Sequence, residues 1–311
     1  MADLFSPLAI ASVELPNRLV MAPSPSGLAA TDGFITPQLI TYYRARARGG
    51  IGLIMSEPFQ VLAPSAEPVA PHLSLWDDAF ISALHRLSDA IHFYDTKLFV
   101  TLDAPPTMAL AEPQLLKQIG EQFIVAAWRA LAAGADGVML SAASNGLLHA
   151  LISPLSNSRD DLYGGAISGR IRLAQEIVEG IRFWLGKRLP IGFRLAAEEL
   201  TTGGSSLQDA RFAARRLAAA GVQLFDVTVI PAAAAPLATF PGWSVPLANA
   251  IKRVTPEASV ICAGELDDPL LADSMIRDES IDLVMVDQPL RDDPGWPEVA
   301  RREVLAVWVI E

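Results

Sequence analysis

Residues 190–229 read PIGFRLAAEELTTGGSSLQDARFAARRLAAAGVQLFDVTV. Two short runs of apolar and β-branched residues, Pro190–Arg194 and Leu224–Val229, flank an alanine- and leucine-rich segment at Leu207–Ala220. This segment follows a serine-rich cap and ends before Gly221, which predicts a helix between two strands. Short apolar runs without strict alternation are typical of parallel strands covered on both faces. The stretch therefore predicts a strand–helix–strand unit of a parallel α/β fold.

The same unit repeats along the chain. The other strands are expected at Arg18–Ala22, Gly52–Ser56, Leu98–Leu102, Gly137–Leu140, Ser259–Ala263 and Asp282–Val286. The other helices are expected at Pro37–Arg48, Asp78–Tyr94, Leu115–Ala133, Ser168–Leu185, Val245–Arg253, Pro269–Ile276 and Trp296–Val304. Eight such units in 311 residues predict one (β/α)₈ TIM barrel spanning residues 1–311. An open doubly wound sheet is the alternative, but no G-x-G-x-x-G motif follows the first strand.

Composition narrows the class of protein. Hydrophobic residues make up 51% of the chain and charged residues 19%, which excludes a disordered chain. The formal charge of -11 makes nucleic acid and anionic membranes poor partners. A single cysteine, Cys262, and four histidines without metal-ligand spacing predict no metal site. Without a basic, apolar leader or a membrane span, we expect a cytoplasmic protein.

Several motifs are similar to one known family. They are Leu4-Phe5-Ser6-Pro7-Leu8, Leu15-Pro16-Asn17-Arg18, Met21-Ala22-Pro23, Tyr42-Tyr43 with Arg46-Ala47, Leu75-Trp76-Asp77-Asp78, Ser153-Pro154-Leu155-Ser156-Asn157 with Arg159, and Tyr163-Gly164-Gly165. Together they resemble the old yellow enzyme family of FMN-dependent ene-reductases, from residue 4 to about residue 300. The resemblance implies a TIM barrel whose site lies at the C-terminal ends of the strands.

The catalytic positions depart from that family. Its fourth strand ends in a His/His or His/Asn pair that binds the substrate carbonyl, and a tyrosine two positions later delivers a proton. The aligned pair here is Ser141 and Ser144, and the tyrosine position is Gly146. Serine hydroxyls donate hydrogen bonds but cannot act as imidazolium, and glycine offers no side-chain proton.

The flavin-ring positions depart as well. Thr101 aligns with a glutamine that meets the flavin ring, and Pro25 aligns with the Thr or Cys beside it. Only Arg194 is retained, at the position of the arginine near the N1 side of the flavin.

At the phosphate end, the family's Gly-Gly turn and Gly-Arg pair are replaced by Gly264-Glu265 and Asp287-Gln288. A like charge at about 5 Å costs ~3 kcal/mol at an effective dielectric near 20. If both carboxylates point inward, FMN affinity should fall by several powers of ten.

These departures lead to the hypothesis of a flavin-independent cyclase or isomerase, of cycloaddition type among others, without cofactor or metal. Its substrate would be a small hydrophobic natural-product intermediate in the vacated flavin pocket, which a shortened capping loop after strand three leaves more open. The expected catalytic residues are Asp103, Arg194, Ser141 and Ser144, and the expected substrate-binding residues are Pro25, Glu57, Thr101, Thr228 and Trp243. An FMN-dependent ene-reductase and a non-catalytic binding partner are the alternatives, and a homodimer is compatible with each.

Overall fold

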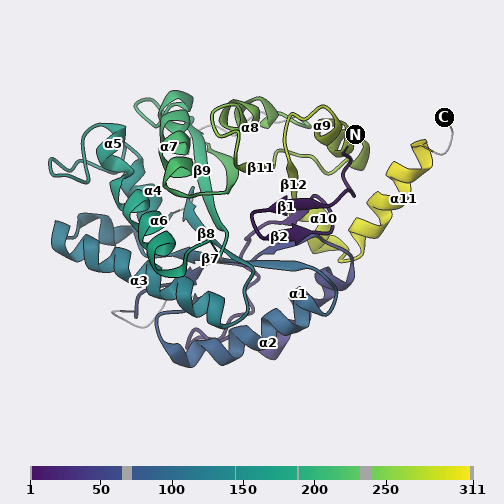
Figure 1. Ribbon diagram of the computed structural model, residues 1–311, viewed down its shortest axis with the longest axis horizontal. Helices are drawn as coiled ribbons and strands as arrows, with labels where there is room; N and C mark the ends of the chain where they lie inside the picture. The colour runs from purple at the N-terminus through teal and green to yellow at the C-terminus, as the bar shows by residue number, and fades with distance from the viewer. Residues whose placement is uncertain (1, 65–71, 144, 188, 232–239, 309–311) are drawn as a thin grey trace.

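The computed structural model describes residues 2–64, 72–143, 145–187, 189–231 and 240–308. Parallel strands lie side by side in the order β4-β3-β12-β11-β10-β9-β8-β7. The first and last strands of this order, β4 and β7, also pair with each other, which closes the barrel. Figure 1 shows the helices ranged around these strands. The predicted (β/α)₈ barrel is therefore confirmed.

All eight predicted strands are present, with small shifts at their ends. They are β3 (Leu19–Met21), β4 (Leu53–Met55), β7 (Lys97–Asp103), β8 (Gly137–Ala142), β9 (Ile191–Glu199), β10 (Leu224–Ile230), β11 (Ser259–Cys262) and β12 (Leu283–Val286). The short strands β5 (Phe59–Gln60) and β6 (Leu73–Ser74) extend the sheet beside β7. Strand β9 runs five residues past its predicted end, because its pairing with β10 continues to Glu199 across an irregularity.

The predicted helices also form. They are α1 (Pro37–Arg48), α2 (Ile81–His92), α3 (Pro113–Ala132), α6 (Arg172–Leu185), α7 (Leu207–Ala220), α8 (Val245–Lys252), α9 (Pro269–Arg277) and α11 (Trp296–Trp308). Helix α7 begins in a capping box between Ser206 and Asp209 and ends at Gly221, whose φ of 128° favours glycine. In the described part of the chain, no helix is both long and apolar enough to cross a bilayer.

The sequence patterns miss several short elements. These are η2 (Pro106–Leu110), α4 (Leu147–Ile152), α10 (Gln288–Asp292), and the antiparallel pair β1 (Leu8–Ile10) and β2 (Val13–Leu15); the short helices η1 (Asp78–Phe80) and α5 (Ile167–Arg170) fall at the start of predicted helices. Each is too short to show a hydrophobic period.

The barrel interior is filled by one side-chain cluster, which includes Phe99, Met139, Leu224 and Ile261. Residues of the β1–β2 pair, among them Leu15, belong to the same cluster and close one end of the barrel. Because successive side chains of a strand alternate between faces, the residues two positions further along each strand also face inward. This alternation positions the candidate site.

The connection after β7 is short. It contains only η2 before α3 begins at Pro113. The Arg159 guanidinium donates hydrogen bonds to two carbonyls of this connection, those of Ala109 (2.7 Å) and Ala111 (2.8 Å). The motif containing Arg159, which carries the most specific part of the family resemblance, therefore fastens this loop.

Candidate functional site

Four polar residues lie on neighbouring barrel strands. Thr101 is on β7, Ser141 on β8, Arg194 on β9 and Asp226 on β10. In the strand register Ser141 pairs with Arg194, and Arg194 pairs with Asp226. Thr101, Ser141 and Asp226 each stand two positions after an interior residue, Phe99, Met139 and Leu224. They therefore form a polar layer inside the barrel, on the C-terminal side of its apolar filling.

Arg194 and Asp226 form a buried ion pair in this layer. The Arg194 Nη1 lies 3.3 Å from the Asp226 Oδ2, and the Asp226 side chain is fully buried. Burial raises the pKa of Asp226, and the charge of Arg194 opposes that rise. Among the described residues, both Asp226 oxygens, Arg194 Nε and Thr101 Oγ1 are buried without a hydrogen-bond partner. Such atoms are costly to leave unpaired, so the layer can form hydrogen bonds with a polar group that enters it.

Asp103 lies at the end of β7, two positions beyond Thr101 on the same inner face. It is buried, and burial raises the pKa of its carboxyl to about 7, although the backbone N–H groups of Ala104 and Leu147 lower it. The charge of His149 lowers it further. Asp103 therefore exchanges a proton near neutral pH, which suits a general acid.

His149 belongs to a hydrogen-bonded group beside Asp103. Its Nε2 lies 3.0 Å from Glu199 Oε1, and the Ser153 hydroxyl donates to Glu199 Oε2 at 2.8 Å. The backbone N–H of Ser205 donates to the same oxygen. Burial raises the pKa of Glu199, but these hydrogen bonds outweigh burial and bring the pKa to about 2. Glu199 is therefore a firmly ionised carboxylate.

Glu57 follows β4 and is also buried. Its Oε1 accepts a hydrogen bond of 2.7 Å from the Ser26 hydroxyl, and its backbone N–H donates to the Tyr43 hydroxyl at 2.8 Å. These contacts tie the loop after β3 to helix α1. Pro25 in that loop is exposed.

Across the barrel from β4, Thr228 lies near the end of β10 and Trp243 lies just before α8. Both side chains are partly buried. Beyond β11, Glu265 is exposed and adopts a φ of 56°. Burial raises the pKa of Asp267, and the charges of Glu265 and Asp287 raise it further, so the three carboxylates lie close together.

The guanidinium group of Arg291 adds a positive charge to this group of carboxylates. Arg291 Nε donates to Asp287 Oδ1 at 2.9 Å, one turn along α10. Gln288 is exposed, and its amide donates to Asp292 on the same short helix. Asp287 is therefore charge-paired.

The structure brings Asp103, Thr101, Ser141 and Arg194 to the same inner wall of the barrel, while Pro25 and Gln288 are exposed. Ser144 lies outside the described residues. Sequence reasoning misses Asp226, although a charged residue inside an apolar strand is a usable signal. It also dismisses His149, whose partner Glu199 is fifty positions away in the chain.

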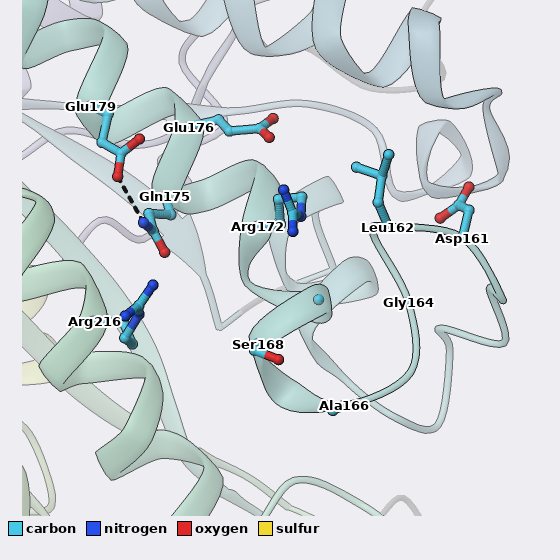
Figure 2. A pocket seen from close by; sticks show the side chains of 11 residues that line it. Asp161, Leu162, Gly164, Ala166, Ser168, Arg172, Gln175, Glu176, Glu179 and Arg216 are labelled. Carbon is cyan, nitrogen blue, oxygen red and sulfur yellow. Dashed lines mark hydrogen bonds between the residues drawn. The ribbon is translucent and has the colours of Figure 1, made fainter.

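A separate pocket of about 460 Å³ lies among the helices. Figure 2 shows Arg172 and Arg216 beside it, together with a hydrogen-bonded pair, Gln175 and Glu179. Its lining comes from residues 161–179 and from α7, and none of the predicted site residues contributes to it. Its two arginines lie among three acidic residues, Asp161, Glu176 and Glu179, so the lining does not favour a ligand of one charge.

Comparison with known proteins gives consistent matches. Residues 3–116 and 113–305 match the sequence model of the NADH:flavin oxidoreductase / NADH oxidase family. A protein named NADH oxidase from Thermoanaerobacter brockii is 34% identical over 330 residues, covering 96% of this chain and 50% of that protein. A protein named NADPH dehydrogenase from Halalkalibacterium halodurans is 32% identical, covering 97% of this chain and 94% of that protein. The chain thus spans half of the first relative and nearly all of the second.

Solved structures share the fold. A complex of 2-naphthoyl-CoA reductase superposes with a TM-score of 0.89 at 22% identity, covering 97% of this chain and 52% of that chain. Morphinone reductase superposes with a TM-score of 0.81 at 22% identity, covering 97% and 90%. At these identities the likeness supports the fold alone.

Two expectations are wrong: the flavin-independent cyclase or isomerase, and the absence of a cofactor. The matching family is described by its flavin, and the relatives are named as NADH oxidase and NADPH dehydrogenase. These findings favour the alternative, an FMN-dependent oxidoreductase.

The structure gives a physical reason for the correction. The expected loss of FMN affinity requires Glu265 and Asp287 to face the phosphate unscreened, whereas Glu265 is exposed and Asp287 is paired with Arg291. At the ring end, Arg194 and Thr101 carry unpartnered buried polar atoms at two of the three positions that the resemblance assigns to the flavin ring, the third being Pro25. The residues at the ring end therefore fit a flavin.

Proposed function

Because the chain belongs to the NADH:flavin oxidoreductase / NADH oxidase family, we propose that it is an FMN-dependent oxidoreductase that uses NADH or NADPH. Bound FMN would supply hydride transfer between the nicotinamide and a small organic substrate or oxygen. One observation carries the proposal: the buried Arg194 Nε and Thr101 Oγ1 lack partners within the described residues. Both atoms can hydrogen-bond to a flat, polar-edged ring.

Each residue of the layer has a separate part in this proposal. Arg194 would bind the polar edge of the ring and favour negative charge there, because guanidinium is always protonated. Asp226 would position Arg194 through their 3.3 Å ion pair. Thr101 would add a hydroxyl at the ring, and Ser141 would present a donor to the substrate.

The phosphate end makes a weaker contribution. Arg291 brings a guanidinium there, but Asp287 already engages it. We therefore assign most of the cofactor affinity to the ring contacts.

Flavin binding tests this function. The purified protein is desalted, its visible absorption spectrum is recorded, FMN is titrated by fluorescence quenching, and NADH and NADPH oxidation are followed. We expect retained or titratable flavin and nicotinamide oxidation that depends on it. An Arg194→Met variant should bind FMN about tenfold to a hundredfold more weakly, since hydrogen bonds to charged groups contribute roughly 1.5–3 kcal/mol.

The matched control is Arg129→Met. Arg129 is also a partly buried, ion-paired arginine, but it contacts Asp78 and the carbonyl of Leu75 on the outer side of the barrel. Its removal should leave FMN affinity unchanged. A folded wild-type protein that neither binds FMN nor oxidises NADH or NADPH contradicts the proposed function.

A further inference from the structure

Asp103 and Gly146 meet at the C-terminal end of the barrel. Asp103 ends β7, and Gly146 immediately precedes α4 after β8. A Cβ atom placed on Gly146 would lie 2.1 Å from Asp103 Oδ1 and 2.4 Å from Oδ2. These separations are far inside van der Waals contact. The carboxyl group of Asp103 therefore occupies the space in which any side chain at position 146 would begin.

Position 146 is where the family resemblance expects the proton-donating tyrosine. This chain has no side chain there, and it has a carboxyl group in that space instead. The exchange is sterically matched, because a residue larger than glycine at position 146 would require the Asp103 carboxyl to move from its observed place.

The carboxyl group is placed to act on a bound molecule. Asp103 faces the barrel interior two positions beyond Thr101, so it extends the polar layer toward the strand ends. Its Oδ1 accepts from the backbone N–H of Ala104 at 2.8 Å, which fixes the orientation of the group. Burial raises its pKa to about 7, so both protonation states are populated near neutral pH.

We propose that the carboxylic acid of Asp103 is the proton donor of this enzyme, in place of a residue at position 146; this inference rests on the oxidoreductase function proposed above. As substrate we take the class that the resemblance to ene-reductases implies, an alkene conjugated to a carbonyl. Its β-carbon accepts a hydride that originates from NADH or NADPH, and its α-carbon accepts the Asp103 proton as the Asp103 O–H bond breaks. The resulting carboxylate regains a proton from water, so one NAD(P)H and one proton are consumed per alkene.

His149 offers a return path for that proton. It lies close enough for its charge to lower the pKa of Asp103, and its side chain is 20% exposed. Its Nε2 is held by Glu199 at 3.0 Å. Asp103 thus sits between the barrel interior and a ring that reaches solvent.

The first test detects the acid itself. Infrared difference spectra of the FMN-loaded protein are recorded between pH 5 and pH 9, and Asp103→Asn is compared with wild type. We expect a protonated-carboxyl band that titrates near pH 7 and disappears in Asp103→Asn. The matched control is Asp136→Asn, at the opposite end of the strands beside His92, which should leave this band in place. Absence of the band in the wild type overturns the inference.

The second test separates the two halves of the reaction with cyclohexenone as the probe. Asp103→Asn should keep FMN binding and NADPH-dependent flavin reduction. It should slow cyclohexenone reduction about 10²- to 10⁴-fold, the range typical of general acid catalysis. The double variant Asp103→Ala/Gly146→Tyr should recover part of the rate, with a pH profile set by a phenol.

The two proposals fail in different ways. If the wild type binds no FMN and oxidises no NADPH, the proposed function fails. If the wild type performs both but Asp103→Asn reduces cyclohexenone at the wild-type rate, or the wild type does not reduce it at all, only the role of Asp103 is overturned.

Discussion

Arg194 and Asp226 are register partners on β9 and β10, and the Arg194 guanidinium lies 3.3 Å from a carboxylate that water does not reach. The two side chains differ in exposure to solvent, since that of Arg194 is 21% exposed and that of Asp226 is fully buried. Arg194 can therefore face a ligand on its open side, while Asp226 depends on Arg194 for compensation. This dependence makes the pair testable without any cofactor.

Replacing Arg194 by methionine should destabilise the apo-protein by about 3–5 kcal/mol at pH 8, because it leaves a buried charge uncompensated. The penalty should shrink as the pH falls, since burial already raises the pKa of Asp226 and protonation removes the charge. Urea unfolding across pH measures both effects. The double variant Arg194→Met/Asp226→Leu should recover most of the stability, and no recovery would argue against the pair as the cause.

Gly146→Ala should cost about 1–3 kcal/mol, because the added methyl group overlaps the Asp103 carboxyl. The same substitution in an Asp103→Ala background should cost much less, since the overlapping atoms are gone. Chemical denaturation of the four proteins gives the coupling free energy directly. Additive costs would show that the two side chains do not compete for space.

Asp103→Asn should stabilise the protein at alkaline pH. The folded-state pKa of about 7 lies above the ordinary 3.8, so ionising Asp103 costs folding free energy as the pH rises between these values. A rise of the pKa to about 7 corresponds to roughly 4 kcal/mol at pH 8 and above. Thermal or urea unfolding should therefore show little difference at pH 4 and a more stable variant at pH 8. A variant that is destabilised equally at both pH values would contradict this expectation.

Glu199→Gln should have the opposite pH dependence. The pKa of Glu199 is about 2, below the ordinary 4.5, so its ionised form contributes stability above pH 4.5 that is lost as the pH falls toward 2. A fall of the pKa to about 2 corresponds to roughly 3 kcal/mol at neutral pH. Denaturation at pH 7 and pH 3 tests this. The comparison variant is Glu176→Gln, which removes a carboxylate on α6 that accepts a hydrogen bond from the Tyr163 hydroxyl. Equal losses at both pH values would exclude the ionic explanation.

The barrel was predictable because its signals are local. The apolar run at Leu224–Val229, the capping residues before Leu207 and the stop at Gly221 each act within a few positions of one element. Repetition of this pattern eight times leaves few ways to bury every strand. The candidate position at the end of β7, Asp103, follows from the same repetition, whereas Arg194 was expected at a strand end and lies within β9.

The cofactor was predicted wrongly because charge at Asp287 was judged from its residue type alone. Its partner Arg291 lies in a short helix that sequence patterns do not reveal, and exposure of Glu265 is a tertiary property. Whether the chain is a single domain, binds a hydrophobic substrate or forms a homodimer stays a prediction.

The sequence by itself determined the order of strands and helices and the family, because hydrophobic periodicity and motifs are written along the chain. Only the tertiary structure decided which polar groups share a neighbourhood. Asp103 and Gly146 are forty-three positions apart, yet the Asp103 carboxyl occupies the space that a side chain on Gly146 would fill. Asp226 acquires its ion-pair partner Arg194 only when β9 and β10 pair inside a closed barrel. Burial and pKa depend on that three-dimensional environment, and no local pattern encodes it.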